Sequence, residues 1–238
     1  MIYFISDLHL DESRPATAQA FLDFLAGPVR QGQALWILGD LFEFWTGDEE
    51  VDTPFNRRIA DALSALRGAG VDIKLVIGNR DFLLGRQFAK RCGLQIVDEP
   101  AQIDLGGHRT VLLHGDAQCT DDVSYQRFRA KVRSPWRQFV FCRLPFWLRL
   151  KITRGVRNQI GNAKQLKEMR IMDVNDDAIA QVFRDSGASW MIHGHTHRPA
   201  RHDLVVDGQA RVRWVLADWH DKATWLEWNG QALQAREA

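Results

Sequence analysis

The sequence has few cysteines and no long apolar run. Its three cysteines, Cys92, Cys119 and Cys142, form no C-x-x-C pair and are odd in number, which argues against a disulfide framework or a thiolate zinc site. We expect them to be small buried or half-buried apolar residues. No stretch approaches the length of a membrane span, and the amino terminus lacks the basic flank and cleavage site of a signal peptide. These absences favour a globular protein of the cytoplasm.

Length and composition are those of an ordinary globular protein. The chain has 238 residues, of which 45% are hydrophobic and 26% charged, so disorder and membrane spanning are both excluded. This length suffices for one large α/β domain with an inserted segment. We find no internal repeat and no low-complexity linker, so two independent domains are not required.

Basic residues are concentrated in one segment. Between Tyr125 and Arg170 there are thirteen Lys or Arg residues and one acid, Glu168, whereas the rest of the chain is acidic. Pro135 and Pro145 divide this segment, in which we expect two or three helices. Such asymmetry usually marks a surface for an anionic partner, and phosphate, nucleic acid and anionic lipid are the candidates.

Strands and helices alternate in the first third of the chain. Residues 1–6, 34–38 and 73–77 are largely apolar runs, typical of strands that are covered on both faces. Between them, apolar residues recur at helical spacing over 18–25 and 55–66. This alternation predicts a parallel sheet with right-handed crossover helices.

The later part of the chain has shorter strands and tight turns. Residues 101–113 predict a hairpin, and a helix is expected over 176–184 with Asn175 as its N-cap. A strand over 189–192 follows. Residues 204–228 have the alternation and turn signals of an antiparallel meander.

Five predicted strands end in oxygen or imidazole side chains. A single polar strand end is most often a capped loop, but in α/β sheets binding groups gather where the strands end. Mixed Asp, Asn and His side chains without Cys suit Mn²⁺, Fe or Zn²⁺ better than Mg²⁺ or Ca²⁺. Seven ligands exceed the need of one ion, and two ions sharing Asp40, beside the permissive Gly39, would use them all. The seven are Asp7, His9, Asp40, Asn79, His114, His195 and His197.

Together these strand ends resemble a known family, the calcineurin-like metallophosphoesterases. The resemblance implies an α/β fold, a four-layer αββα sandwich with an inserted helical cap. The matching blocks are Asp7-x-His9, Gly39-Asp40, Gly78-Asn79, His114-Gly115 and Gly194-His195-x-His197. It further implies one ion held by Asp7, His9, Asp40 and His197, and a second held by Asp40, Asn79, His114 and His195.

Four other histidine positions lie outside the ligand pattern. His193 does not match a ligand position and is expected to be a strand-end residue. His108, His202 and His220 have no motif support, and we interpret them as structural or surface residues.

Arg80 departs from the general family pattern. Members of the family usually have a His after the Asn of the third block, thought to assist the leaving group, whereas this sequence has Arg80 after Asn79. Arginine stays protonated and cannot donate a proton at neutral pH, so an alkoxide leaving group would lose its general acid. A phosphate leaving group needs none, and Arg80 could neutralise its developing charge, which favours a pyrophosphate substrate. The alternative is an Arg80 paired with Asp81 or with a surface acid.

The basic segment is also rich in aromatic residues. Over residues 128–152, Phe, Trp and aliphatic side chains alternate with Arg and Lys, as in helices that bind lipid or lie at a membrane surface. One alternative is a cap whose apolar face packs on the core while its basic face is solvated. Another is nucleic-acid binding through stacking aromatics, but residues 144–148 are too apolar for that, so no nucleic acid is expected.

Further residues resemble one family of these enzymes, the UDP-2,3-diacylglucosamine pyrophosphatases of bacterial lipid A biosynthesis. These are Arg80, Asp121-Asp122, Lys164, Lys167 and the segment 171–175. The resemblance implies water attack on the α-phosphorus, yielding UMP and 2,3-diacylglucosamine 1-phosphate, with two Mn²⁺ per chain. It implies catalysis by Asn79, Arg80 and His114, and substrate contacts from these three and from Asp122, Lys164, Lys167 and His195.

The same resemblance implies a division of the chain. Residues 1–122 and 172–238 would form the metallophosphoesterase core, and 123–171 a helical cap that receives the acyl chains. The enzyme would lie on the inner face of the cell inner membrane as a peripheral protein. Residues 156–161 lack the serine-rich stretch of some members.

Two rival functions remain at this point. A nuclease or cyclic-nucleotide phosphodiesterase could share the same fold and metal ligands, although Arg80 argues against it. A non-catalytic scaffold could bind a protein or a membrane through the basic cap, but it would not need seven intact ligands.

Overall fold

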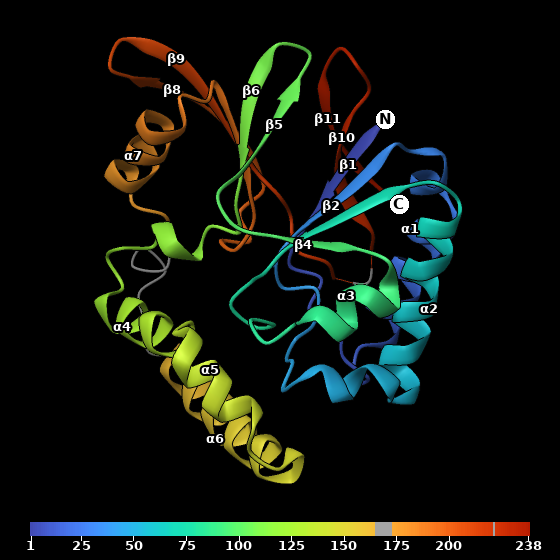
Figure 1. Cartoon of the computed structure of the whole chain (residues 1–238). Helices are drawn as coiled ribbons and strands as arrows, with labels where there is room; N and C mark the ends of the chain where they lie inside the picture. The colour runs from blue at the N-terminus through green and yellow to red at the C-terminus, as the bar shows by residue number, and fades with distance from the viewer. Residues whose placement is uncertain (165–172, 221) are drawn as a thin grey trace.

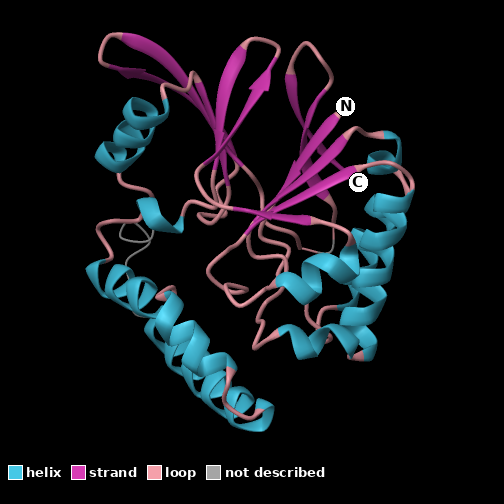
Figure 2. Cartoon of the chain, viewed as in Figure 1, coloured by secondary structure: helices cyan, strands magenta, loops and turns pink. Residues whose placement is uncertain are grey.

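The protein is a sandwich of two β-sheets with helices on both outer faces (Figure 1 and Figure 2). The computed structural model describes residues 1–164, 173–220 and 222–238, with side chains described outside 156–172 and 221. The predicted α/β class and the four-layer αββα arrangement are confirmed.

The first sheet has six strands in the order β11-β10-β1-β2-β3-β4, where β10 is Thr224–Trp228 and β11 is Leu233–Glu237. Its parallel strands are β1 (Ile2–Ile5), β2 (Ala34–Leu38), β3 (Asp72–Val76) and β4 (Gln95–Val97). Helices α1 (Pro15–Ala26) and α2 (Pro54–Gly68) connect the first three strands and cover the outer face of the sheet. The predicted parallel sheet with two crossover helices is confirmed.

The second sheet has five strands in the order β5-β6-β7-β9-β8. They are β5 (Ala101–Leu105), β6 (His108–Leu112), β7 (Trp190–His193), β8 (Ala200–Val206) and β9 (Gln209–Val215). Its outer face is covered by α7 (Asp176–Ser186), whose N-cap Asn175 accepts hydrogen bonds from the backbone amides of Asp177 and Ala178. The predicted hairpin, helix and N-cap are confirmed.

The predicted antiparallel meander is wrong in its last strand. β8 and β9 form the expected hairpin, but β10 (Thr224–Trp228) leaves the second sheet and pairs with β1 and with β11 (Leu233–Glu237). The connection after β9 is anchored by Trp219, which is fully buried against Phe24 of α1 at 5.6 Å between ring centroids. Alternating apolar residues predict a strand but do not say which sheet it joins.

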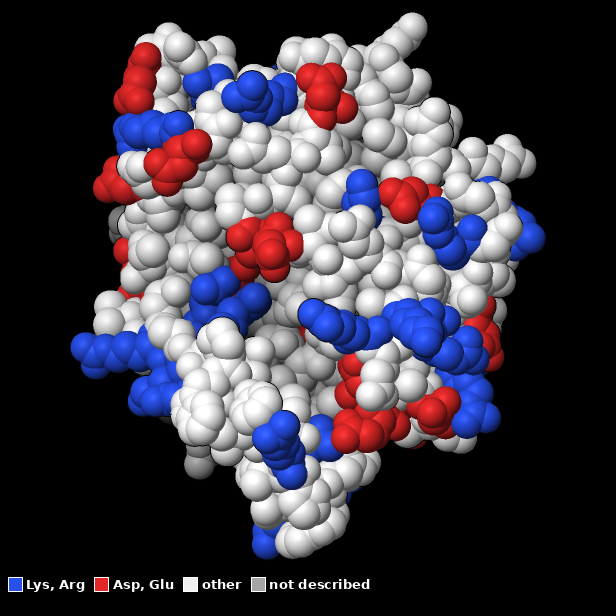
Figure 3. Space-filling model, in the orientation of Figure 1, with Lys and Arg blue, Asp and Glu red and all other residues white. Residues whose placement is uncertain are grey.

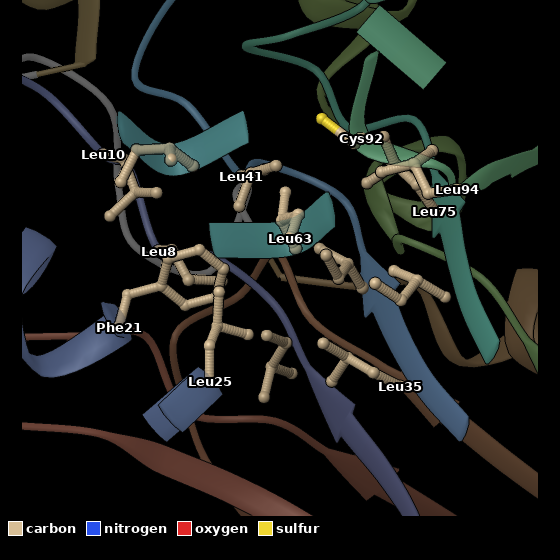
Figure 4. Close-up of a cluster of buried hydrophobic side chains, with 14 of the residues drawn as sticks. Leu8, Leu10, Phe21, Leu25, Leu35, Leu41, Leu63, Leu75, Cys92 and Leu94 are labelled. Atoms are coloured by element: carbon tan, nitrogen blue, oxygen red, sulfur yellow. The ribbon is translucent and has the colours of Figure 1, made fainter. Parts of the chain in front are cut away.

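Three buried apolar layers separate the four structural layers. Leu35 of β2 and Leu63 of α2 belong to the layer between the first sheet and its helices, drawn in Figure 4. The next residue, Trp36, points to the other face of β2 and packs between the two sheets. Phe183 of α7 and Met191 of β7 form the layer outside the second sheet. Because β2 is covered on both faces, its sequence is continuously apolar.

Helix α3 (Arg86–Cys92) was not predicted, and a remote side chain caps it. Its seven residues bury only Phe88 and Cys92, which is too few for a helical period to be visible. The carboxylate of Asp48 accepts hydrogen bonds from the backbone amides of Gln87 at 2.8 Å and Phe88 at 3.1 Å. It also accepts one from Gly85, the N-cap residue, at 2.9 Å. Asp48 therefore satisfies the free amides that a helix start leaves unpaired. Short 3₁₀ helices occupy Pro28–Gln31, Asp48–Asp52 and Asp116–Gln118.

Asp48→Ala is expected to lower the free energy of unfolding by about 1–2 kcal/mol, because the first turn of α3 would lose its cap. Urea unfolding monitored by circular dichroism measures this change. Asp52→Ala is the matched control, since the Asp52 side chain is 73% exposed and lies 3.9 Å from Arg57, an arrangement that contributes little. Equal changes in the two variants would contradict the capping role.

Three helices extend away from the sandwich as a cap: α4 (Val123–Val132), α5 (Pro135–Cys142) and α6 (Phe146–Lys164) (Figure 1). The predicted helical content of the basic segment is confirmed. Trp136 and Trp147 are 70% and 67% exposed. Cys142 is exposed, contrary to expectation, because α5 has no buried residue, whereas Cys92 and Cys119 are buried. Over the described residues, the chain has no helix with the length and apolar character needed to cross a membrane.

Candidate metal centre

The predicted ligands come from loops at the ends of strands in both sheets. Asp7 and His9 follow β1, Asp40 follows β2, and Asn79 comes shortly after β3, all in the first sheet. In the second sheet His114 follows β6, and His195 and His197 follow β7. Figure 3 shows the molecule hollowed between the cap and the sandwich, with Lys and Arg side chains on both sides of the hollow.

One set of donors gathers around Asp7. His197 Nε2 lies 3.4 Å from Asp7 Oδ1 and 3.4 Å from His9 Nε2, while His9 Nε2 is 4.0 Å from Asp7 Oδ1. All three ligand atoms lie within 4.8 Å of one another. This spacing is compatible with one cation at their centre.

A second set gathers around His114. The ligand atoms of Asp7, Asp40 and His114 also lie within 4.8 Å of one another. His114 Nε2 is 2.9 Å from Asn79 Oδ1 and 3.7 Å from Asp40 Oδ1. The other oxygen of Asp40 lies 3.9 Å from His9 Nε2, so this carboxylate stands between the two sets. The ring of His195 lies 5.0 Å from that of His114, centroid to centroid.

The electrostatics of the site fit a bound cation. Among the described residues, Asp7 Oδ1 is buried without a hydrogen-bond partner, which is costly unless a cation satisfies it. Burial alone would lower the pKa of His114, but the carboxylates of Asp40 and Asp7 raise it to about 9. Burial likewise opposes the charge of His197, yet the nearby carboxylates of Asp218 and Asp7 raise its pKa to about 9. The buried carboxylates therefore favour positive charge, and the imidazole and carboxylate donors suit a divalent transition metal.

The ligand loops have an unusual backbone. Asp7, His9, Asp40, His195 and His197 all have positive φ, between 49° and 69°. Outside these loops, the described chain has one further non-glycine residue of this kind, in a hairpin turn. Left-handed conformations cost energy for residues with a Cβ atom and cluster at functional sites. Five such residues in the ligand loops indicate that the backbone conformation of these loops is set by where each ligand side chain must point, at a cost in backbone energy.

Two glycines allow the loops to approach one another. A Cβ atom on Gly78 would collide with the side chain and backbone nitrogen of Asp40. A Cβ atom on Gly39, where φ is +90°, would collide with the ring of His114. The expected role of Gly39, to let the backbone crowd the site, agrees with this geometry.

Oxygen atoms face the outer nitrogens of the histidines, and the sequence interpretation missed the two acids among them. Glu43 Oε2 lies 3.2 Å from His9 Nδ1, and Asp218 Oδ2 lies 3.1 Å from His197 Nδ1. His114 Nδ1 is 2.9 Å from the carbonyl oxygen of Leu38. Such partners fix the ring so that Nε2 faces the site. Nothing in the sequence around Glu43 or Asp218 distinguishes them from the other acids of the chain.

Arg80 lies at the edge of the ligand cluster. Its backbone amide donates to Asp40 Oδ1 at 2.8 Å, and its guanidinium is 3.3 Å from Glu43 Oε1. Of the alternative partners expected for Arg80, Asp81 is not observed, because it accepts the backbone amides of Leu41 and Gly78 instead. Pairing with another acid is observed, and that acid is the half-buried Glu43. Burial, followed by the charge of Asp40, raises the pKa of Asp81 to about 6.

Four other residues were predicted to contact the substrate or to end a strand, and the structure describes the side chains of two of them. Asp122 is buried and caps α4 by accepting the backbone amide of Tyr125 at 2.9 Å. The side chain of Lys164 and the whole of Lys167 lie outside the described residues. His193 ends β7, as expected, and is buried, with Nε2 lying 3.1 Å from Arg213 Nη1.

The three histidines without motif support belong to neither set of donors, although His220 Nε2 lies 2.5 Å from Asp218 Oδ2, the oxygen that faces His197. His108 and His220 are exposed, and His108 stacks on Trp190. His202 is half-buried on β8.

Comparison with known proteins identifies the family. A family profile described as calcineurin-like phosphoesterase matches residues 1–199. A protein of Aromatoleum aromaticum named UDP-2,3-diacylglucosamine hydrolase is 51% identical over 227 residues, which cover 95% of this chain and 92% of the relative. Proteins of the same name from Vibrio parahaemolyticus and Shigella sonnei are 43% and 44% identical, covering 97% and 94% of this chain and 95% and 93% of theirs. The chain belongs to the calcineurin-like phosphoesterases and, within them, to the family of UDP-2,3-diacylglucosamine hydrolases.

Proposed function

We propose that this protein hydrolyses the pyrophosphate bond of UDP-2,3-diacylglucosamine in lipid A biosynthesis. Water attacks the α-phosphorus, and the products are UMP and 2,3-diacylglucosamine 1-phosphate. One observation carries the proposal: the Asp7, Asp40 and His114 donors meet in one place, in a chain 51% identical to a protein named for this hydrolysis.

Seven side chains would hold two Mn²⁺ ions. The first ion is assigned to Asp7, His9, Asp40 and His197, and the second to Asp40, Asn79, His114 and His195. When bound, the ions would polarise phosphate oxygens and lower the pKa of the attacking water. The oxygens of Asp40 face both sets of donors, so Asp40 would help to hold both ions.

Arg80, Asn79 and His114 are the proposed catalytic residues. Asn79 and His114 lie 2.9 Å apart beside Asp40 Oδ1, and Arg80 is tied to the same oxygen through its backbone amide. The Arg80 guanidinium presents a planar fork to phosphate oxygens and neutralises the charge of the departing phosphate. Because that phosphate leaves as a stable anion, Arg80 does not need to supply a proton.

The cap is the proposed site for the lipid part of the substrate. We assign residues 123–171 to this cap and residues 1–122 and 172–238 to the core. Contacts to the substrate outside the catalytic residues are assigned to Asp122, Lys164, Lys167 and His195. No nucleic acid is expected as a partner.

The direct test is the reaction itself. Purified protein with Mn²⁺ is expected to release UMP from UDP-2,3-diacylglucosamine, and EDTA to stop the release until Mn²⁺ is restored. Intact substrate in the presence of Mn²⁺ overturns the proposal. Cleavage of DNA or cyclic nucleotides instead would support the rival phosphoesterase function, and an absence of bound metal at micromolar Mn²⁺ would support the scaffold.

The cap also supports peripheral binding to the inner face of the cell inner membrane. Trp136 and Trp147 are largely exposed, and Phe139 on the same helix as Trp136 is 50% exposed. Basic residues of the cap accompany these aromatics, and the Arg143 guanidinium lies 3.9 Å from the centre of the Phe139 ring. Exposed aromatics with neighbouring cations suit an interface of anionic lipids.

The double variant Trp136→Ser, Trp147→Ser is expected to bind anionic phospholipid vesicles about tenfold more weakly or worse, since it removes two large apolar side chains from the lipid contact. Vesicle co-sedimentation measures the partition. Val205→Ser is the control, because Val205 is 77% exposed on β8, outside the cap. Unchanged partition of the double variant would exclude this membrane surface.

A further inference from the structure

Helix α4 contacts the sandwich through side chains spaced one helical turn apart. Tyr125 and Arg129 both reach Asp116, two residues after His114. The Tyr125 hydroxyl and the Arg129 Nε each donate to Asp116 Oδ2 at 2.7 Å. Asp116 is fully buried, so this ion pair is shielded from water and fixes the start of the cap on the loop that carries His114.

Arg129 also reaches the backbone of His114 through a second acid. Its Nη2 donates to Glu99 Oε1 at 2.8 Å, while Glu99 Oε2 accepts the backbone amide of His114 at 3.0 Å. The Arg129 guanidinium therefore contacts two acids that are joined to the His114 loop: Asp116, which belongs to that loop, and Glu99, which accepts the backbone amide of His114. The position of the His114 loop depends on the position of α4.

Arg133, one turn further along the cap, holds the loop that carries Asn79. Its Nη2 donates to the carbonyl oxygens of Ile77 at 3.1 Å and Gly78 at 3.0 Å, the two residues directly before Asn79. The Arg133 side chain is 23% exposed, so it lies outside the core. The two hydrogen bonds to the Asn79 loop hold it in place.

These contacts are unevenly distributed over the site. They reach the loops of Asn79 and His114, and the centre of the Tyr125 ring lies 6.2 Å from that of the His195 ring, with 29° between the ring planes. Within the described residues, no hydrogen bond or ion pair of Tyr125, Arg129 or Arg133 reaches the ligands assigned to the first ion alone. The cap therefore braces one half of the metal centre.

We propose that Arg129 and Arg133 are positioning residues that set the affinity of the second metal ion by fixing the loops of Asn79 and His114 to α4. The proposal rests on the two-ion centre described under the proposed function. It makes the cap part of the metal centre as well as the lipid site, although neither arginine touches a ligand side chain.

The test is a calorimetric titration of metal-free protein with Mn²⁺. Wild-type protein is expected to bind two ions. In Arg133→Met one dissociation constant is expected to rise about tenfold or more, the scale seen when partners of metal ligands are lost, while the other stays within twofold. Hydrolysis should fall at low Mn²⁺ and recover at high Mn²⁺, because the ligands themselves are intact.

Matched variants separate this role from a general loss of structure. Arg127→Met, on the exposed side of α4, should leave both constants unchanged, and Arg133→Lys should recover part of the affinity. Thermal melting checks that each variant is folded. Arg133→Met is preferred to Arg129→Met, because Arg129 makes the closer contact with buried Asp116, at 2.7 Å against 3.6 Å for Arg133.

The contradicting outcomes are distinct. Two unchanged constants in Arg133→Met, or equal weakening of both ions, overturn the positioning role, as does an activity loss that Mn²⁺ does not restore. Wild-type protein that binds fewer than two ions overturns the two-ion centre and this inference with it. UMP release by wild-type protein in the same preparation reports separately on the proposed function.

Discussion

Asp40→Asn is expected to reduce UMP release from UDP-2,3-diacylglucosamine by about a thousandfold or more, the scale of losing a group that organises transition-state charge. The carboxylate of Asp40 reaches both sets of donors, because one of its oxygens lies 3.9 Å from His9 Nε2 and the other 3.7 Å from His114 Nε2. The amide keeps the shape of the side chain and can still accept the backbone amide of Arg80. The loss is therefore expected to come from the missing charge.

The measurement is kcat/KM at saturating Mn²⁺, together with the number of Mn²⁺ ions bound. Asp40→Asn should bind fewer ions than wild-type protein at equal free Mn²⁺. Asp61→Asn is the control, because Asp61 is an exposed acid paired with Arg91 on the outer helices. Activity above a tenth of wild type in Asp40→Asn would refute the bridging role.

Arg80→Ala is expected to lower kcat by about a thousandfold, within the range known for arginines that stabilise phosphoryl transfer. The side chain lies at the edge of the ligand cluster beside Glu43 and does not enter either donor set. Metal binding should therefore remain intact while turnover is lost. This combination distinguishes Arg80 from the ligands.

Two further variants sharpen this result. Arg80→Lys keeps the positive charge but loses the planar fork, so an intermediate activity is expected. Arg91→Ala, on α3 and outside the site, should match wild type. If Arg80→Ala retained full turnover, Arg80 would be a structural partner of Glu43, and the argument for a pyrophosphate substrate would lose its basis.

The fold and the ligands were predictable wherever a strand is a continuous apolar run and a polar ligand follows soon after its end. β1 and β2 are buried on both faces, so their sequences are continuously apolar, and a ligand stands two residues after each run. β3 is less regular, because Lys74 interrupts its apolar residues. Asp7 and Asp40 were found in this way. The crossover helices were visible because α1 and α2 each bury one face against the sheet.

Other features have no local signal in the sequence. α3 is short and is started by Asp48, a residue far from it in the chain. β10 has the alternation of a strand, but its partners β1 and β11 belong to the first sheet, and nothing in the alternation selects them. Glu43 and Asp218 act through the histidines that they orient, and isolated acids with no fixed spacing cannot be recognised without coordinates.

The metal ligands follow strands of both sheets, so the formation of the metal centre depends on the docking of the two sheets. Neither sheet alone carries a complete set of donors, since Asp40 belongs to one sheet and His114 to the other. The centre can form only after the chain has been made as far as His197 and the halves have docked. Bound cations would then cross-link the halves, so the folded protein would gain resistance to denaturation in proportion to the logarithm of free metal, by mass action.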